Sequence, residues 1–129
     1  MDMHDRSTRP DRWQAARLAA AALCAVSLPM AALAHHGWSE YDAGKPVTVE
    51  GTIRASGYEH PHGMLKLEGG GKTWTVVLAP PSRMENRGLA SSMLKVGGSA
   101  KVEGYPHRTD ANEMRAERIT VDGKTIELR

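Results

Sequence analysis

Apolar and polar residues alternate along residues 46–56, and Ile53 belongs to the apolar set. This period of two predicts a β-strand with one buried face. The same alternation recurs at residues 64–68 and 72–78, and the glycines Gly69-Gly70-Gly71 between these segments predict a tight turn. We therefore expect the second and third strands to form a hairpin.

A helix is expected after the third predicted strand. Ser82 and Glu85 have the spacing of a capping box, in which two side chains satisfy backbone N–H groups at the start of a helix. Gly88 follows one turn later, and glycine commonly ends a helix. Residues 91–96 predict a further helical turn, closed by Gly97-Gly98.

Three further strands are predicted at residues 100–105, 115–121 and 124–128, the last two joined by a turn at Asp122-Gly123. Three strands, a helix and two or three more strands is the element order of the OB-fold. We expect an all-β fold over residues 35–129, a small OB-like antiparallel barrel of five to six strands with one short helix between strands three and four. The alternative is another small antiparallel barrel or sandwich with the helix packed differently.

The first part of the chain has the organisation of a secretory signal peptide. Four arginines lie within residues 1–17, and an apolar run occupies residues 18–34. The small residues Ala32 and Ala34 suit the positions that signal peptidase recognises before its cleavage site. We expect a signal peptide over residues 1–34, Sec-type export to the periplasm and no stable membrane anchor after cleavage. An uncleaved N-terminal anchor is the alternative.

Composition and charge exclude several classes of protein. The chain has 17 Lys and Arg against 15 Asp and Glu, a net charge of +2, which provides no basic surface able to hold nucleic acid. The one cysteine, Cys24, lies in the apolar run, so a domain of residues 35–129 has no disulfide. Leu23 precedes Cys24, where a lipoprotein signal has a small residue, so no lipid anchor is expected.

Five of the six histidines follow the predicted cleavage site. Cleavage after Ala34 makes His35 the first residue, so that its free amine and its ring nitrogen can chelate one metal ion together. His36 follows directly. A further nitrogen from a distant imidazole completes the T-shaped or square arrangement that Cu(II) prefers. Copper is therefore the expected cofactor.

The remaining three histidines lie in predicted loops. His60 and His62 flank Pro61 between the first two strands, and residues at this spacing on an extended segment point the same way. His107 lies between the fourth and fifth strands. In an OB-fold these two loops flank one binding face, so the three imidazoles are expected to lie near one another. The candidate metal ligands are thus His35, His36, His62, His60 and His107.

Each of these features also has a purely structural interpretation. The His35-His36 pair can be a solvated, disordered chain start, and the loop histidines can make local hydrogen bonds or face solvent. Trp38 and Tyr41 are expected to pack the N-terminal arm against the domain. Methionines suit Cu(I) ligation, but scattered ones are more often core filler. The four of this domain are Met64, Met84, Met93 and Met114.

Several short segments together resemble a known family. They begin at the His-His pair and end at the Asp-Gly turn, and comprise residues 34–39, 41–42, 45–53, 61–62, 94–97, 102–105 and 118–124. In these segments the chain resembles a secreted bacterial family of unknown function, DUF6152. The resemblance implies export and a small β-barrel, and it brings no established activity. His35, His36 and His62 match recurring positions of the family, whereas His60 stands where the family has Asn.

Three functional hypotheses follow. The first is an exported, non-enzymatic module that binds copper through the amine and ring of His35, with His36 and His62 as further ligands. The second is a periplasmic domain that binds a protein, peptide or glycan without metal. The third, a copper-dependent oxidase, ranks last because a domain of this size has little room for a deep pocket. No residue pattern indicates covalent catalysis, so no catalytic residue is expected.

Overall fold

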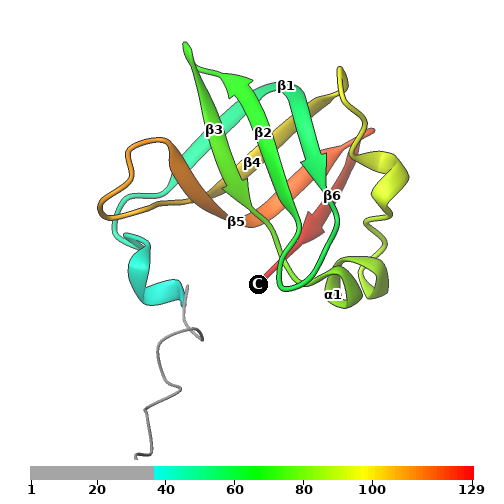
Figure 1. Cartoon of the computed structure of the whole chain (residues 1–129), viewed down its shortest axis with the longest axis horizontal. Coiled ribbons are helices and arrows are strands. Elements are labelled where there is room, and N and C mark those ends of the chain that lie inside the picture. The colour runs from blue at the N-terminus through cyan, green and yellow to red at the C-terminus, as the bar shows by residue number, and fades with distance from the viewer. Residues whose placement is uncertain (1–36) are drawn as a thin grey trace, which may run out of the picture. The chain divides into compact units, whose positions relative to one another are not determined.

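The computed structural model describes residues 37–129. The predicted signal peptide, together with His35 and His36, lies outside the described residues. No helix within residues 37–129 is long and apolar enough to cross a membrane. In chain order (Figure 1) the elements are η2 (Trp38–Glu40), β1 (Val47–Gly57), β2 (Met64–Gly69), β3 (Lys72–Val77), α1 (Pro81–Asn86), η3 (Ser91–Met93), β4 (Ser99–Pro106), β5 (Glu113–Val121) and β6 (Lys124–Glu127).

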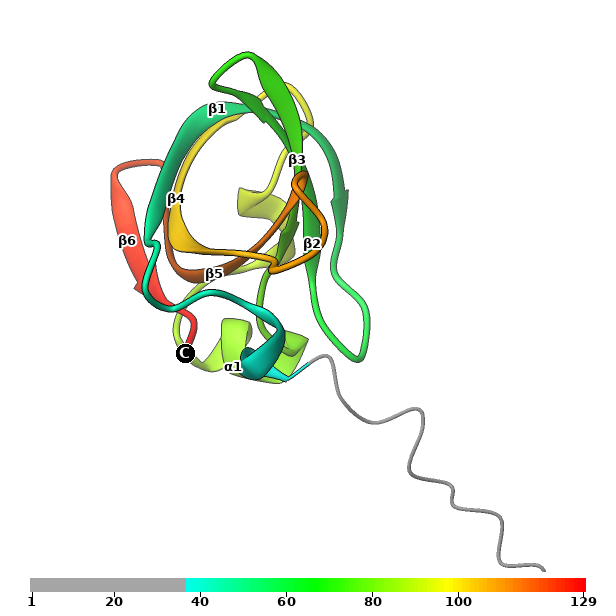
Figure 2. The ribbon, with the colours of Figure 1, turned by 90° about the vertical axis from the view of Figure 1, so that its left-hand side faces the viewer.

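Five strands close into a barrel, and the sixth extends it at one edge. β1 pairs with both β2 and β4, β2 continues to β3, and β4 continues to β5. β3 and β5 then pair with each other and complete the ring that Figure 2 shows, with β6 outside it on β5. The predicted OB-like barrel with one short helix between strands three and four is thereby confirmed.

The pair that closes the barrel is parallel, with Thr75, Val76 and Val77 opposite residues 113–115. We expected an antiparallel barrel, so this parallel pair corrects the prediction. The other pairs of neighbouring strands are antiparallel. A parallel pair is possible because α1, η3 and β4 lie between β3 and β5 in the chain, and this long connection lets β5 return in the direction of β3.

The core follows the alternation read from the sequence. Ile53, Leu65, Leu67 and Val76 are fully buried, and their neighbours Arg54, Lys66 and Glu68 are exposed. Two glycines allow strands to approach closely. A Cβ on Gly51 would lie 2.0 Å from the carbonyl oxygen of Glu68, and one on Gly104 would lie 2.0 Å from that of Arg115. Any larger residue there would push β1 from β2, or β4 from β5.

A helix forms after the third strand as predicted, but it begins earlier than the capping box implied, and the capping box is wrong. α1 begins at Pro81, its N-cap is Pro80, and no side chain caps it. Ser82 therefore lies inside the first turn. Proline is favoured at this first position because its fixed φ suits a helix and its missing N–H would be unpaired there anyway. Gly88 ends the segment with a φ of +87°, as expected.

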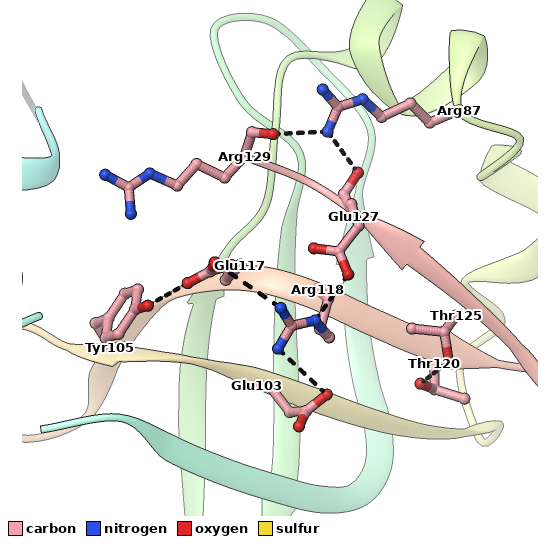
Figure 3. A network of polar contacts seen from close by, with 9 residues as sticks. All are labelled: Arg87, Glu103, Tyr105, Glu117, Arg118, Thr120, Thr125, Glu127 and Arg129. Atoms are coloured by element: carbon pink, nitrogen blue, oxygen red, sulfur yellow. Dashed lines mark hydrogen bonds and ion pairs between the residues drawn. The ribbon is translucent and has the colours of Figure 1, made fainter.

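The outer surface of β4, β5 and β6 carries a polar network (Figure 3). The Arg118 guanidinium lies 2.8 Å from Glu127 and 3.9 Å from both Glu103 and Glu117. Arg87 donates to the main-chain carbonyls of Glu127 and Arg129, at 2.8 and 2.7 Å. Arg118 thus gathers three carboxylates around one guanidinium, and Arg87 protects the outer edge of the short strand β6.

Candidate functional site

A cavity of about 210 Å³ opens where the β1–β2 loop meets the N-terminal arm, the described segment before β1 that carries Trp38 and Tyr41. Its lining combines an imidazole, a thioether, a carboxylate and a phenol with apolar surface, from Tyr41, Pro61, His62, Met64, Val77 and Glu113. These four functional groups offer nitrogen, sulfur and oxygen donors to one small space. The cavity therefore contains one residue that the sequence singled out as a ligand, His62, and brings three other donors to it.

The loop that carries His62 is fixed to the end of β3. The amide of the buried Gly63 donates to the carbonyl of Ala79 at 2.9 Å, and the amide of Leu78 donates to Gly63 at 2.8 Å. The peptide bond between His60 and Pro61 is cis, and the chain bends at these two residues. His62 is half-buried and His60 is exposed. The two side chains thus occupy different environments although they lie two residues apart.

A buried arginine lies beside His62. The guanidinium Nη2 of Arg115 is 3.5 Å from His62 Nε2, and the Arg115 residue is only 6% exposed. The Trp38 ring covers the guanidinium at 4.4 Å and also lies against Arg129 at 4.6 Å. Burial lowers the pKa of Arg115, and the nearby positive charges of Arg83 and Arg129 act in the same direction. Trp38 therefore shields a cation that contacts His62.

Tyr41 fixes the carboxylate of the cavity. Its hydroxyl donates to Glu113 Oε1 at 2.5 Å, and the residue is only 1% exposed. Burial, followed by the hydrogen bond to Glu113, raises the pKa of Tyr41 well above its ordinary value. The phenol therefore stays protonated and holds one oxygen of Glu113. The interpretation of Trp38 and Tyr41 as packing residues of the N-terminal arm is confirmed for both.

His107 serves the local structure. Its Nδ1 accepts the backbone N–H groups of Thr109 at 3.2 Å and Asp110 at 3.0 Å, and so caps the turn that follows it. Its Nε2 lies 3.9 Å from Glu40 Oε2, and its ring meets the Tyr41 ring edge-on at 5.2 Å. With Nδ1 occupied in this way, His107 is positioned for packing and hydrogen bonding.

The three loop histidines, His60, His62 and His107, differ in their surroundings. Within residues 37–129 no three His, Cys, Asp or Glu side chains are grouped so as to hold a metal ion. His60 lines a neighbouring hollow, which His62 also lines, and His107 is tied to its own turn. The expected grouping of His60, His62 and His107 into one ligand set is therefore not observed. The site predicted for His35, His36 and His62 includes residues outside the described part and stays a prediction.

Sequence reasoning missed Arg115 and Glu113. Met114 between them points into the barrel, so alternation places both on the outer side of β5, where charged residues usually face solvent. They are covered instead by Trp38 and Tyr41 from the N-terminal arm. The only signal was the presence of two aromatic residues in a short segment outside any predicted strand.

Comparison with known proteins identifies the family. The model of a family of unknown function, DUF6152, matches residues 22–115. The match spans most of the chain, so the protein belongs to this family, as the resemblance of its sequence segments implied. No curated protein matches the chain.

Proposed function

We propose that this member of the DUF6152 family is an exported, non-enzymatic copper-binding module of the periplasm. The proposed ligands are the amine and ring nitrogen of His35, exposed by cleavage after Ala34, together with His36 and His62. Nitrogen ligands in a T-shaped or square arrangement suit Cu(II). The ordered domain then contributes one ligand, and the chain start contributes the others.

The anchoring of Trp38 carries this proposal. Trp38 stacks on the Arg115 guanidinium, which lies 3.5 Å from His62 Nε2. His36 is two residues before Trp38, and a two-residue step spans at most about 7 Å. An imidazole side chain adds several ångströms to this reach. The position of Trp38 therefore supports a site shared by the chain start and the His62 loop.

The cavity chemistry supports a metal more than an organic substrate. Pockets for small organic ligands are commonly about 300–1,000 Å³, whereas this cavity has about 210 Å³. It can accept an ion with bound waters. Glu113 supplies a carboxylate that offsets part of the charge of a bound cation. These features favour an ion over an organic molecule as the occupant of the cavity.

The contact between His62 and Arg115 does not prevent ligation. A separation of 3.5 Å is at the outer limit of hydrogen bonding, so replacing it with a metal bond costs little. The guanidinium remains stacked on Trp38 and keeps that part of its environment. Copper binding at His62 is therefore expected to move the imidazole by a small amount and to leave the fold unchanged.

A pair of single substitutions tests the proposal. The full chain is expressed with its signal peptide, the exported protein is purified, and mass spectrometry establishes whether it begins at His35. His62→Ala is expected to weaken Cu(II) binding by at least about tenfold in calorimetric titration, because loss of even outer-shell groups has that effect. His60→Ala is the matched control, since His60 is an exposed imidazole of the same loop.

Three results would contradict the proposal, and a fourth would favour the rival interaction hypothesis. Wild-type protein that binds Cu(II) no better than an unrelated protein of equal histidine content would remove copper as the ligand. Equal losses in His60→Ala and His62→Ala would remove the specific role of His62. Oxygen consumption by the copper-loaded protein would show that it is an enzyme and not a non-enzymatic binding module. A partner bound equally well after replacement of His35, His36 and His62 would favour the interaction hypothesis.

A further inference from the structure

Met64 occupies an unusual position for a methionine of a small barrel. It is the first residue of β2 and is 42% exposed, and within residues 37–129 the only other exposed large hydrophobic side chain is Val96. The other three methionines of the domain are buried or half-buried. The interpretation as core filler therefore suits Met84, Met93 and Met114, but it does not explain Met64.

Met64 lies beside His62 at the mouth of the cavity. Both residues line the 210 Å³ cavity, and both line the neighbouring hollow that includes Glu59 and His60. The loop between them is short and is fixed by the hydrogen bonds of Gly63 to Ala79 and Leu78. The imidazole and the thioether are therefore held next to the same space by a piece of backbone that these hydrogen bonds tie to the chain after β3.

The ligand chemistry of this pair favours cuprous over cupric ion. A thioether is a soft ligand and selects Cu(I), while imidazole suits copper in both oxidation states. The one cysteine of the chain is Cys24, before the predicted cleavage site. A methionine is therefore the soft ligand that the domain can offer, and Met64 is the methionine that lines the cavity.

The charge of Arg115 acts in the same direction. A copper ion on His62 Nε2, at a bond length of about 2 Å, would lie within about 5.5 Å of the guanidinium nitrogen. Coulomb repulsion scales with charge, so Cu(II) meets about twice the repulsion from Arg115 that Cu(I) meets, and the Glu113 carboxylate of the same cavity offsets part of this repulsion for either ion. The apolar part of the lining, Pro61 and Val77, also disfavours the more highly charged ion.

We propose that the cavity binds Cu(I) in preference to Cu(II), with the Met64 thioether as a ligand beside His62. This inference rests on the proposed copper-binding function. It adds the preferred oxidation state of the copper and a sulfur ligand, neither of which follows from the histidines. Cu(II) then depends mainly on the nitrogen ligands of the chain start, and Cu(I) depends on the cavity.

The test compares Met64→Leu with Met93→Leu in the exported protein. Leucine keeps the volume of methionine and removes the sulfur, and Met93 lies in η3 and does not line the cavity. Cu(I) affinity is measured without oxygen by competition with a colorimetric chelator, and Cu(II) affinity by calorimetry. We expect Met64→Leu to lower Cu(I) affinity about a hundredfold and to leave Cu(II) affinity within about threefold. At 59 mV per tenfold change, the reduction potential of the bound Cu(II)/Cu(I) couple then falls by about 120 mV.

The outcomes separate the two proposals. If the wild type binds copper and Met64→Leu matches Met93→Leu in Cu(I) affinity, the inference is overturned and the copper-binding function stands. If the wild type binds neither ion, both proposals fail. X-ray absorption of the Cu(I)-loaded wild type gives an independent check that needs no variant. A sulfur scatterer at about 2.3 Å from copper is expected, and a shell of nitrogen and oxygen alone would overturn the role of Met64.

Discussion

Gly104→Ala tests the close packing on which the barrel depends. Gly104 lies in β4 next to a register shift against β5, and a Cβ there would lie 2.0 Å from the Arg115 carbonyl oxygen and 2.8 Å from its carbon. Real contacts of a Cβ are at least 3.0 Å, so the strands must separate by about an ångström. β5 cannot simply retreat, because β3 holds its other side. The barrel must therefore distort.

The expected cost follows from the nature of the obstructing atoms. Overpacking typically costs about 1–3 kcal/mol, and the obstruction here is backbone that cannot rotate away. We expect about 3 kcal/mol of lost folding free energy, at the upper end of that range, or a melting temperature lower by about 12–24 °C for a domain of this size. Urea unfolding and thermal unfolding, both followed by circular dichroism, measure these quantities.

Gly57→Ala is the matched control for this prediction. Gly57 ends β1 and has no positive φ, and a Cβ added to it would meet no atom within 4 Å beyond its chain neighbours. Alanine there is expected to change stability by less than about 1 kcal/mol, with a small gain from the restricted unfolded chain. If Gly104→Ala proves as stable as Gly57→Ala, the close β4–β5 approach and the reasoning from it are refuted.

Three further predictions concern the arm, the site and the sheet edge. Folding raises the pKa of Tyr41, so its contribution to folding stability is present below about pH 10 and is lost as pH rises beyond it. In urea unfolding, Tyr41→Phe should therefore lose less stability with rising alkaline pH than the wild type, and an equal dependence on pH in both proteins would refute this. Trp38→Ala removes the stacking partner of Arg115 and should weaken Cu(II) binding by about tenfold or more. Trp74→Ala, on β3 and outside the lining of the cavity, should leave Cu(II) binding unchanged. Arg87→Ala removes the donor to two carbonyls of the C-terminal edge, so amide exchange should accelerate in residues 124–129 and stay unchanged in β1; uniform acceleration would contradict an edge-specific role.

The fold was largely predictable because its elements depend on local patterns. The alternation around Ile53 correctly assigned the inward face of β1, and Asp122-Gly123 forms the expected tight turn with positive φ at both residues. The start of α1 was misplaced because the proline at the first helical position competed with a serine-based cap. The parallel β3–β5 pair was not predictable, because pairing between distant strands leaves no short-range signal.

The site was less predictable because its burial depends on the arm. Alternation along β5 assigns Arg115 and Glu113 to the outer side, and nothing local indicates that Trp38 and Tyr41 cover them. His62 was named as a candidate and does line the cavity. His107, named with it, caps a turn through Nδ1, and a count of histidines in loops does not reveal this role.

The central claim is that the chain start beginning at His35 chelates Cu(II) together with the domain. The most direct measurement is a Cu(II) titration of the exported protein beside a variant with a Ser-Gly-Ser-Gly extension before His35. The extension moves both histidines away from the first few positions of the chain. At those first positions, an amine and backbone amides can themselves chelate Cu(II). The account predicts a loss of affinity of about a hundredfold. Equal affinity of the two proteins, with the first residue of each verified by mass spectrometry, would contradict it.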